Sequence, residues 1–502
     1  MKKICLYFEI HQIIHLKRYR FFDIGRDHYY YDDYENERSI NDIAERSYVP
    51  ALQTLIQMCK DHPEFRVAFS LSGCGLEQLE FHAPQVVDLL QEINSTGQVE
   101  FLCEPYSHGL SSLANEESFA AEVKRMSDRI KELFGKRPKV FRNSSLIYND
   151  EIGAQVAAMG FKGILTEGAK QVLGWKSPHY IYHCASDPRL KLLLRDINLS
   201  EDITERFTSH PLMADQWLDW IASTPEGENV INIFGELVTF GIFHPLQSGI
   251  LEFLKAIPVL AKERGIGFAL PSDLCAEKSV GAIEVPYNIS WVDEERDTSC
   301  WLGNVMQREA FNKLYSVADR VRVCGDRRIQ MDWDCLQASN NFRFMTTKPG
   351  YQYRGIYDSP YDAFTNYMNI LGDFISRVNN LYGGADNEEI DGLITMIKNQ
   401  GDELAAKDKE IERLRKKLEK YNPTEVTEKK SVAKKEPAAK KASTAKKSAS
   451  KAAPASKAIS EQTAPKAVAK AIETPKAKEV KKAAKKSPAK KTAAPKTAAK
   501  KK

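Results

Sequence analysis

The stretch FRNSSLIYND, residues 141–150, indicates the kind of fold to expect. It begins with apolar residues, as the end of a buried strand does, and then becomes polar at Arg142 and Asn143. Two hydroxyl side chains, Ser144 and Ser145, follow at the point where a catalytic loop would make use of a carboxylate. A buried strand that opens into a polar loop is typical of α/β barrels, whose functional side chains follow the strands.

Similar short apolar runs recur along the first 270 residues, with amphipathic stretches between them. They are KICLYFEI (3–10), FRVAFSL (65–71), QVEFLCE (98–104), KVFRNS (139–144), KGILTE (162–167), KLLLRD (191–196), VINIFGE (230–236) and IGFAL (266–270). This alternation predicts an α/β fold, a TIM-like (β/α) barrel that is either complete or one unit short.

Polar side chains follow nearly every predicted strand. They are His11, Ser70, Ser72, Glu104, His108, Ser144, Ser145, Glu167, Asp196, Asp202, Glu236, Ser272 and Asp273. A single residue of this kind is more often a helix cap or a solvated loop residue. A whole series at the carboxyl ends of barrel strands predicts a shared cleft, because barrel active sites form at that rim.

The sequence divides into four regions. Residues 1–279 are the predicted barrel, and residues 280–382 are helical and aromatic in pattern. Apolar residues then recur every seven positions from Ile390 to Leu418, which predicts a short coiled coil over residues 383–421 and a homo-oligomer. A single amphipathic helix folded back on the body is the alternative. Residues 422–502 are predicted to be a disordered tail rich in Lys, Ala and Pro.

Charge separates the tail from the rest of the chain. Residues 424–502 contain 24 Lys and 6 Glu, a net charge of +18, which leaves −14 for residues 1–423. In composition the tail resembles the basic tails of histone H1-like bacterial proteins. We expect it to bind nucleic acid or another polyanion through counterion release. The alternative is a role within the chain, in which the tail shields the acidic body or keeps the protein in solution.

Cysteine usage and hydropathy indicate a cytoplasmic protein. The nine cysteines are scattered singly, with no paired spacing that would suggest a metal site, so we expect reduced thiols and no metal or cofactor. The apolar run at the N-terminus is interrupted by Glu9 and His11, which favours a strand over a signal peptide. No run is long enough to predict a membrane span.

Several of these stretches, taken in order, resemble the motifs of α-amylase-like members of glycoside hydrolase family 57. They are FEIHQIIHLKRYRFFDIG, GQVEFLCEPYSHGL, FRNSSLIYND and INIFGELVTFG, with SWVDEERDTSCWLGNVMQR and YDSPYDAFTNYMN in the helical part. The resemblance runs from the first strand to about Val378. It implies an incomplete seven-stranded barrel followed by helices, acting on α-glucans with retention of configuration.

The resemblance also assigns roles to individual residues. The family's nucleophile, a Glu in the third motif, falls on Ser145, and its acid/base, an Asp in the fourth motif, falls on Glu236. A second acid of the fourth motif is replaced by Val238, and the Pro of the first motif by Ile13. The remaining candidates for contact with a sugar are His11, Glu104, His108, Arg142, Trp291 and Trp301.

Plainer interpretations of these residues stay open. His11 and His108 would then be structural, and Glu236 would be a buried acid paired with Arg142. The segment DEERD (293–297) would be a solvated charged turn, with only the flanking tryptophans to suggest sugar stacking.

Three functions follow from the sequence. The first is an α-glucan-binding protein with impaired or no glycosidase activity, because retaining hydrolysis needs two carboxyl groups and a Ser hydroxyl cannot replace one of them. The second is an active α-glucan hydrolase or 4-α-glucanotransferase with a relocated acid, for which Glu104 and Glu167 are the candidates. The third is a protein that associates with nucleic acid or another polyanion through its tail.

Overall fold

The computed structural model describes residues 1–349 and 355–382, together with separate positions between 392 and 415. The predicted coiled coil (383–421) therefore lies largely outside the described residues, and the predicted tail (422–502) lies wholly outside them. No helix in the described part of the chain is long and apolar enough to cross a membrane.

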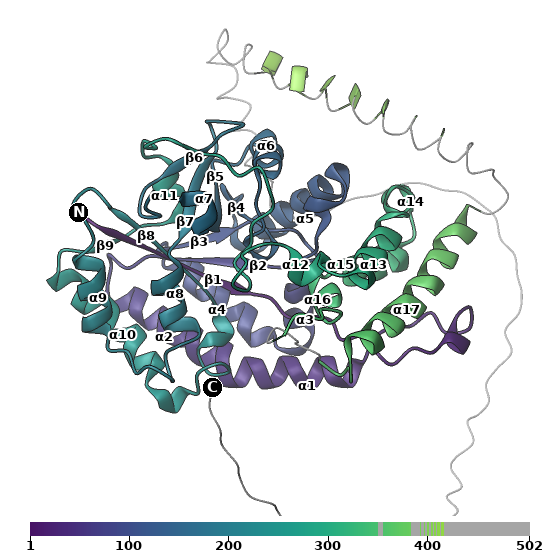
Figure 1. Ribbon diagram of the computed structural model, residues 1–502, viewed down its shortest axis with the longest axis horizontal. Helices are drawn as coiled ribbons and strands as arrows, with labels where there is room; N and C mark the ends of the chain where they lie inside the picture. The colour runs from purple at the N-terminus through teal and green to yellow at the C-terminus, as the bar shows by residue number, and fades with distance from the viewer. Residues whose placement is uncertain are drawn as a thin grey trace, which may run out of the picture. The chain divides into compact units, whose positions relative to one another are not determined.

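Seven parallel strands form a closed ring. Figure 1 shows the strands with helices of the barrel region around them. They are β1 (Lys3–Ile10), β2 (Val67–Leu71), β3 (Val99–Leu102), β4 (Val140–Arg142), β5 (Gly163–Glu167), β7 (Lys191–Arg195) and β8 (Val230–Glu236). Each strand pairs with the next in this order, except β3 with β4, and β8 pairs with β1. The gap between β3 and β4 is closed by a parallel bridge between Cys103 and Phe141.

The ring confirms the TIM-like barrel that the apolar runs predicted, in the seven-stranded, incomplete form that the resemblance implied. The eighth run forms only the two-residue strand β9 (Gly267–Phe268), which pairs with the start of β1 and adds no unit to the ring. Two further short strands lie outside the ring: β6 (Tyr182–Cys184) runs antiparallel to β7, and β10 (Ala282–Ile283) pairs with β6.

The strands of the ring pair unevenly. β1 and β8 are in register at seven positions, from Lys3 opposite Val230 to Glu9 opposite Glu236. Within the described strands, β7 and β8 are in register at a single position, Arg195 opposite Asn232. The Asn232 side chain adds one bond across this junction, donating to the Leu194 carbonyl at 3.0 Å.

Helices of the barrel region connect the strands. They are α1 (Asp33–Ile43), α2 (Val49–Asp61), α3 (Gly73–His82), α4 (Pro84–Ser95), α5 (Glu116–Phe134), α6 (Asp150–Ala158), α7 (Lys170–Leu173), α8 (Ile197–Thr204), α9 (Ala214–Ala222), α10 (Ile250–Glu263) and α11 (Pro271–Cys275). A single π-turn, η2 (Ala44–Tyr48), joins α1 to α2.

Helix α5 illustrates how the sequence sets these elements. Asn115 caps its first turn by accepting from the Ser118 amide, and Gly135 ends it in the left-handed conformation. Its buried apolar residues recur at helical spacing and pack the helix against the barrel; they are Phe119, Val123, Met126, Ile130 and Phe134.

A second group of helices follows the barrel. It consists of α12 (Ser299–Leu302), α13 (Val305–Tyr315), α14 (Ala318–Val323), α15 (Arg327–Gln337), α16 (Ser339–Arg343) and α17 (Pro360–Leu381). Helix α16 starts against the loop that follows β3, because the Ser339 amide donates to the His108 carbonyl at 3.1 Å. Helix α17 is tied to the loop after β1 through buried Asp373, which accepts from the Tyr30 hydroxyl at 2.6 Å and the Gly25 amide at 2.7 Å.

Short 3₁₀ turns complete the chain. They are η1 (Phe21–Asp23), η3 (Ser111–Leu113), η4 (Ser144–Leu146), η5 (Leu237–Thr239) and η6 (Leu246–Ser248). Two of them, η4 and η5, directly follow β4 and β8, so the chain turns sharply at the ends of these strands. The turn after β8 ends at Gly241, which has φ +120° and lies against the backbone of Arg46.

Replacement of Gly241 by Ala is expected to lower the free energy of unfolding by more than the backbone strain of a positive φ accounts for. An added Cβ would lie 2.0 Å from the Arg46 carbonyl oxygen, so the backbone would have to move. Gly97 is the matched control, because it also has a positive φ, +74°, but has nothing within 4 Å of an added Cβ. We expect Gly97→Ala to cost about 1 kcal/mol and Gly241→Ala about 3 kcal/mol or more in denaturant unfolding. Equal losses for the two variants would contradict this close approach.

Candidate functional site

Candidate site residues meet where the barrel strands end. His11 follows β1, Glu104 and His108 follow β3, Arg142 ends β4, and Glu236 ends β8. Because all seven strands are parallel and closed into a ring, these ends share one rim.

The buried guanidinium of Arg142 lies at the centre of this rim. The side chain is fully buried, and it pairs with both oxygens of Glu9, with Nη2 at 2.8 Å from Oε2. Its Nη1 also lies 3.1 Å from Oε2 of Glu104. Burial disfavours the charged form, but the two carboxylates outweigh it and raise the pKa of Arg142 above its ordinary value. This guanidinium thus connects β1, β3 and β4.

His108 completes the network as a second cation. Its Nδ1 lies 3.2 Å from Oε1 of Glu9 and 3.2 Å from Oε1 of Glu104. Burial lowers the pKa of His108, but the charges of Glu9 and Glu104 and a hydrogen bond to Glu104 raise it overall. For Glu104 the balance is reversed: burial raises the pKa, and His108, Arg142 and the Ser70 hydroxyl lower it overall. Two carboxylates and two cations therefore neutralise one another inside the barrel.

His11 is the neutral member of the site. Its ring stacks on that of His108, with centroids 4.0 Å apart. Burial lowers its pKa well below the ordinary value, and the charges of His108 and Arg142 lower it further. Nδ1 lies 2.7 Å from the Ser72 hydroxyl, while Nε2 is buried without a hydrogen-bond partner. A ligand that both donates and accepts hydrogen bonds would satisfy this nitrogen.

A metal ion would compete with the groups already present. One ligand atom each from Glu9, Glu104 and His108 lie within 4.8 Å of one another. However, Arg142 already pairs with both carboxylates, and Nδ1 of His108 is the atom that contacts them. A metal would have to displace the guanidinium and take the His108 proton, so the donor set fits the internal ion pairs better than a cation.

Glu236 is the partly buried acid of the site. Burial is the main reason that its pKa rises to about 7, and the charge of Glu9 adds to this rise. Arg343, Arg142 and His108 act in the opposite direction. Among the described residues its carboxyl group has no ion pair, because the guanidinium of Arg142 is taken by Glu9 and Glu104. The alternative in which Glu236 pairs with Arg142 is therefore wrong.

Glu9 is the residue that sequence reasoning missed. It lies in register with Glu236 on the adjacent strand, so both side chains leave the sheet on the same face. Its sequence signal is a single carboxylate within an otherwise apolar strand, two positions before His11. Residues two apart in a strand share a face, so Glu9 could have been grouped with His11.

Ser145 lies in a tightly constrained loop. Both Ser145 and Leu146 have left-handed backbones, with φ +52° and +55°. The Asn143 side chain holds the loop by donating to the Ile147 carbonyl at 2.8 Å and to the Ser112 hydroxyl at 2.9 Å. No described side chain accepts from the Ser145 hydroxyl, so no neighbouring base is in place to activate it.

Strained backbone is concentrated in the loops at this rim. Within the described residues, the non-glycine residues with positive φ are His108, Ser145, Leu146, Asp293 and Arg296. Such conformations cost free energy and tend to occur at functional sites.

The two candidate tryptophans differ in exposure. Trp291 is partly buried, packs edge-on against Phe234 at 5.5 Å, and donates its amide to the Ser145 carbonyl at 3.3 Å. Trp301 is only 1% exposed, so its ring belongs to the core. Neither indole N–H has a hydrogen-bond partner. Trp291 is therefore the tryptophan that lies beside the Ser145 loop.

The segment 293–297 is not simply a solvated turn. Asp293 is buried and accepts from Lys348 at 2.6 Å and from the Cys300 thiol at 2.9 Å. Arg296 donates to the Trp291 carbonyl and to Glu201. The expectation of a solvated charged turn is therefore wrong for Asp293 and Arg296, because both have partners distant in sequence. Glu294 and Glu295 remain exposed.

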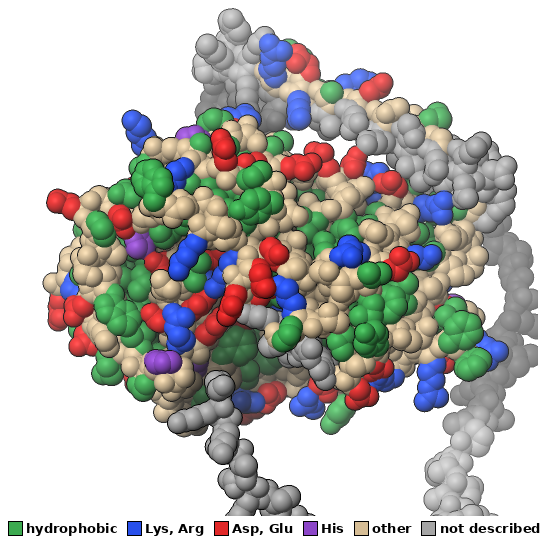
Figure 2. All heavy atoms as spheres, viewed as in Figure 1, with side chains coloured by type: hydrophobic (Ala, Val, Ile, Leu, Met, Phe, Trp, Pro, Cys, Tyr) green, Lys and Arg blue, Asp and Glu red, His purple; other side chains and the backbone are tan. Residues whose placement is uncertain are grey.

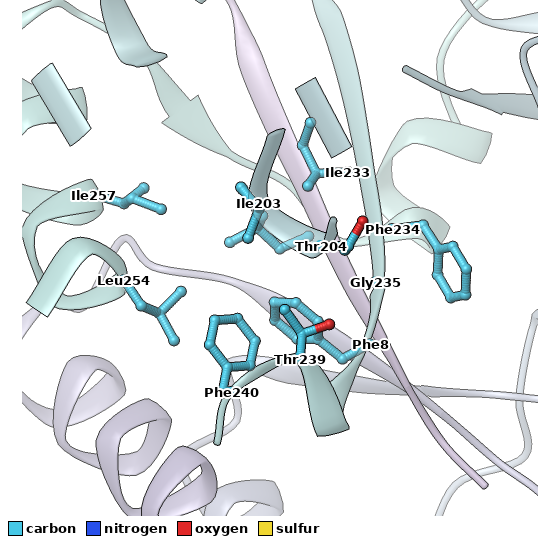
Figure 3. A pocket seen from close by; sticks show the side chains of 11 residues that line it. Phe8, Ile203, Thr204, Ile233, Phe234, Gly235, Thr239, Phe240, Leu254 and Ile257 are labelled. Atoms are coloured by element: carbon cyan, nitrogen blue, oxygen red, sulfur yellow. The ribbon is translucent and has the colours of Figure 1, made fainter. Parts of the chain in front are cut away.

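The small cavity beside the barrel is not a ligand site. It has a volume of about 10 Å³ and lies between β1, β8, α8 and α10, where apolar side chains such as Phe8, Phe240 and Leu254 surround it (Figure 3). This volume is close to the minimum that can hold one water molecule.

Both a family model and a known protein match this sequence. The model of Glycosyl hydrolase family 57 matches residues 5–286. A Methanocaldococcus jannaschii protein named "Putative alpha-amylase" is 37% identical over 369 residues, which cover 69% of this chain and 78% of the relative.

Solved structures are similar in fold at low sequence identity. The GH57-type branching enzyme of Pyrococcus horikoshii has a TM-score of 0.57 at 11% identity. The match covers 80% of this chain and 95% of the chain of that enzyme. The 4-α-glucanotransferase of Thermococcus litoralis has a TM-score of 0.55 at 14% identity. The match covers 74% of this chain and 60% of the chain of that enzyme. The family model covers more than half of the residues and a relative with 37% identity agrees with it, so the chain belongs to glycosyl hydrolase family 57.

Proposed function

We propose that this protein is an α-amylase-like α-glucan-binding protein of carbohydrate metabolism whose glycosidase activity is impaired or absent. The observation that carries the proposal is Ser145. Retaining hydrolysis needs one carboxylate that attacks the anomeric carbon and one carboxylic acid that protonates the leaving oxygen. A Ser hydroxyl without a neighbouring base does not supply the first.

The rest of the rim supports sugar binding. His11 offers an unpartnered ring nitrogen, and Glu236 offers a carboxyl group whose pKa of about 7 lets it donate or accept near neutral pH. Glucan hydroxyls also donate and accept, so neutral sugars suit both groups. Trp291 lies beside the Ser145 loop, where an aromatic ring can pack on a sugar face.

The two acids considered as relocated nucleophiles have other partners. Glu104 is fully buried and bonded to Ser70, His108 and Arg142. Glu167 is equally buried and pairs with Arg195 at 3.1 Å. Neither carboxylate can reach a substrate without breaking these contacts, which argues against both.

Glu9 gives the active-enzyme alternative its best support. It faces Glu236 in register, and neighbouring parallel strands lie about 4.8 Å apart, close to the carboxylate spacing of retaining glycosidases. Its pairing with both guanidinium nitrogens of Arg142 opposes this role. An active hydrolase or glucanotransferase that uses Glu9 and Glu236 is therefore the second candidate.

The basic tail supports a separate activity, binding to nucleic acid or another polyanion. On the face shown in Figure 2, acidic and basic side chains of the folded part are interspersed. We therefore propose that polyanion binding depends on the +18 tail.

The heptad residues that are described, such as Leu404 and Ile411, are 63% and 47% exposed. Exposed apolar residues at this spacing support a coiled-coil homo-oligomer, and the nine buried free cysteines support a cytoplasmic location.

The variant Ser145→Glu places a carboxylate at this position. We expect it to release reducing sugar from maltooligosaccharides at least about tenfold faster than wild type. Wild type should bind these sugars in calorimetry and release little reducing sugar. Ser145→Gln is the matched control, because it adds the same bulk without a charge and should gain nothing. Ser145→Glu combined with Glu236→Gln should lose the gain. Robust turnover by wild type that Glu236→Gln leaves unchanged would refute both the proposed function and the site. Turnover by wild type that Glu9→Gln and Glu236→Gln each abolish would favour the second candidate.

The raised pKa of Glu236 predicts a pH-dependent stability. The neutral acid is favoured in the folded state, so its contribution is fully present at low pH and is lost as the pH rises from about 4.5 to about 7. The free energy of unfolding of wild type, relative to Glu236→Gln, should therefore fall across this window in urea titrations. Exposed Glu226→Gln serves as the control. A difference between wild type and Glu236→Gln that does not change with pH would show that the carboxyl group titrates normally.

Full-length protein is expected to retard DNA at low salt, with an affinity that falls steeply as salt rises, because tail lysines release counterions. A protein ending at Tyr421 should not bind. The double variant Ile397→Asp and Ile411→Asp should bind more weakly with its tails intact, because loss of the oligomer removes avidity. Equal binding by the Tyr421 truncation would exclude the tail as the nucleic-acid arm, and unchanged binding by the double variant would exclude avidity.

A further inference from the structure

A large cleft lies away from the strand-end site. Its volume is about 1160 Å³, and it is lined by α1, α3 and α5 of the barrel region and by α14 and α15 of the later helices. None of Ser145, Glu236, His11 and His108 lines it. Typical pockets for small molecules measure roughly 300–1,000 Å³, so this cleft is large enough for an oligomeric ligand.

Charged groups in the cleft are mostly paired with one another. Arg125 pairs with Asp334 and also lies over the ring of Tyr106, with its guanidinium carbon 3.5 Å from the ring centroid. Arg129 pairs with Glu80, and the Tyr106 hydroxyl donates to Glu77. Because most charges are already compensated, the cleft offers little to a strongly charged partner. Its paired carboxylates and guanidinium groups keep free lone pairs and N–H groups, which suit neutral hydroxyls that both donate and accept.

One buried acceptor in the cleft wall lacks a partner. Gln78 is 7% exposed, and its Nε2 donates to the carbonyls of Gln12 at 3.1 Å and Ile13 at 2.8 Å. Its Oε1 is buried with no hydrogen-bond partner. Buried acceptors are rarely left unsatisfied, so a donor from a ligand would remove an existing cost.

Apolar side chains at the rim of the cleft are unusually exposed. Phe81 is 82% exposed, Met331 is 53% exposed and Tyr29 is 48% exposed. Two aromatic rings beside planar polar groups form the combination that binds sugars, because pyranose faces stack on rings while the hydroxyls meet the polar groups.

The cleft also adjoins the loops that carry the strand-end site. Tyr106 lies between Glu104 and His108 in the chain, and Gln78 holds the backbone immediately after His11. A ligand in the cleft would therefore contact the supports of both histidines.

We propose that this cleft is a second α-glucan-binding site, which holds several glucose units of a chain and is distinct from the strand-end site. The ligand class rests on the proposed function, whereas the location of the cleft does not. Short sugars bind at the strand ends, and longer chains also bind in the cleft.

The test compares maltose with maltoheptaose in calorimetry on full-length protein. The double variant Tyr29→Ala and Phe81→Ala should lose about tenfold or more in affinity for maltoheptaose, since each ring contributes stacking, and should bind maltose as wild type does. The control variant Phe22→Ala and Tyr34→Ala removes another exposed Phe and another exposed Tyr, neither of which lines the cleft, and should bind both sugars normally. Matching far-UV circular dichroism spectra would exclude unfolding.

Hydrogen exchange provides a second measurement that needs no variant. Maltoheptaose should protect amides in Gly73–His82 and Arg327–Gln337, and maltose should not. If wild type binds maltoheptaose while the double variant binds it equally well and neither helix is protected, the cleft site is wrong but the proposed function stands. If wild type binds no glucan at all, the proposed function fails, and the ligand class of the cleft fails with it.

Discussion

The site depends on one buried charge, the guanidinium of Arg142. It lies inside the barrel, where an unpaired cation would be very unfavourable, so it must be surrounded by carboxylates. Glu9 and Glu104 supply them from β1 and from the end of β3, and His108 is held between the same two acids. Removing one partner of a buried ion pair typically costs about 3–5 kcal/mol, because the other charge stays behind. The arrangement of the rim is therefore a requirement of folding as well as of any binding.

This constraint explains how the loop after β4 accommodates a serine. The loop keeps its shape through Asn143, the backbone of Ser145 and the contact with Trp291, none of which uses the side chain at position 145. Arg142 finds both of its carboxylates elsewhere. The position can therefore lose an acid without leaving a buried charge unpaired, and the surrounding site persists.

The sequence predicted the strands well because a barrel strand is buried on both faces and appears as a short apolar run between helical patterns. It also predicted which strand ends carry His11, Glu104, His108 and Glu236, because a polar residue directly after an apolar run is visible locally. It could not identify Glu9, whose role depends on Arg142, 133 residues further along the chain. For the same reason Asp293 looked solvated, since its partner Lys348 lies 55 residues away. The large cleft was also invisible, because it combines helices from both ends of the described region.

The uneven pairing of the ring has a mechanical consequence. β7 and β8 are in register at one position, whereas β1 and β8 are in register at seven. Among the described strands, two junctions of the ring are paired at a single position, β3–β4 through Cys103 and Phe141 and β7–β8 through Arg195 and Asn232. The second of these lies next to the strand that carries Glu236. Under heat or tension the barrel should open along one of these two seams, and opening between β7 and β8 would take the acid at the end of β8 out of alignment with the rest of the site.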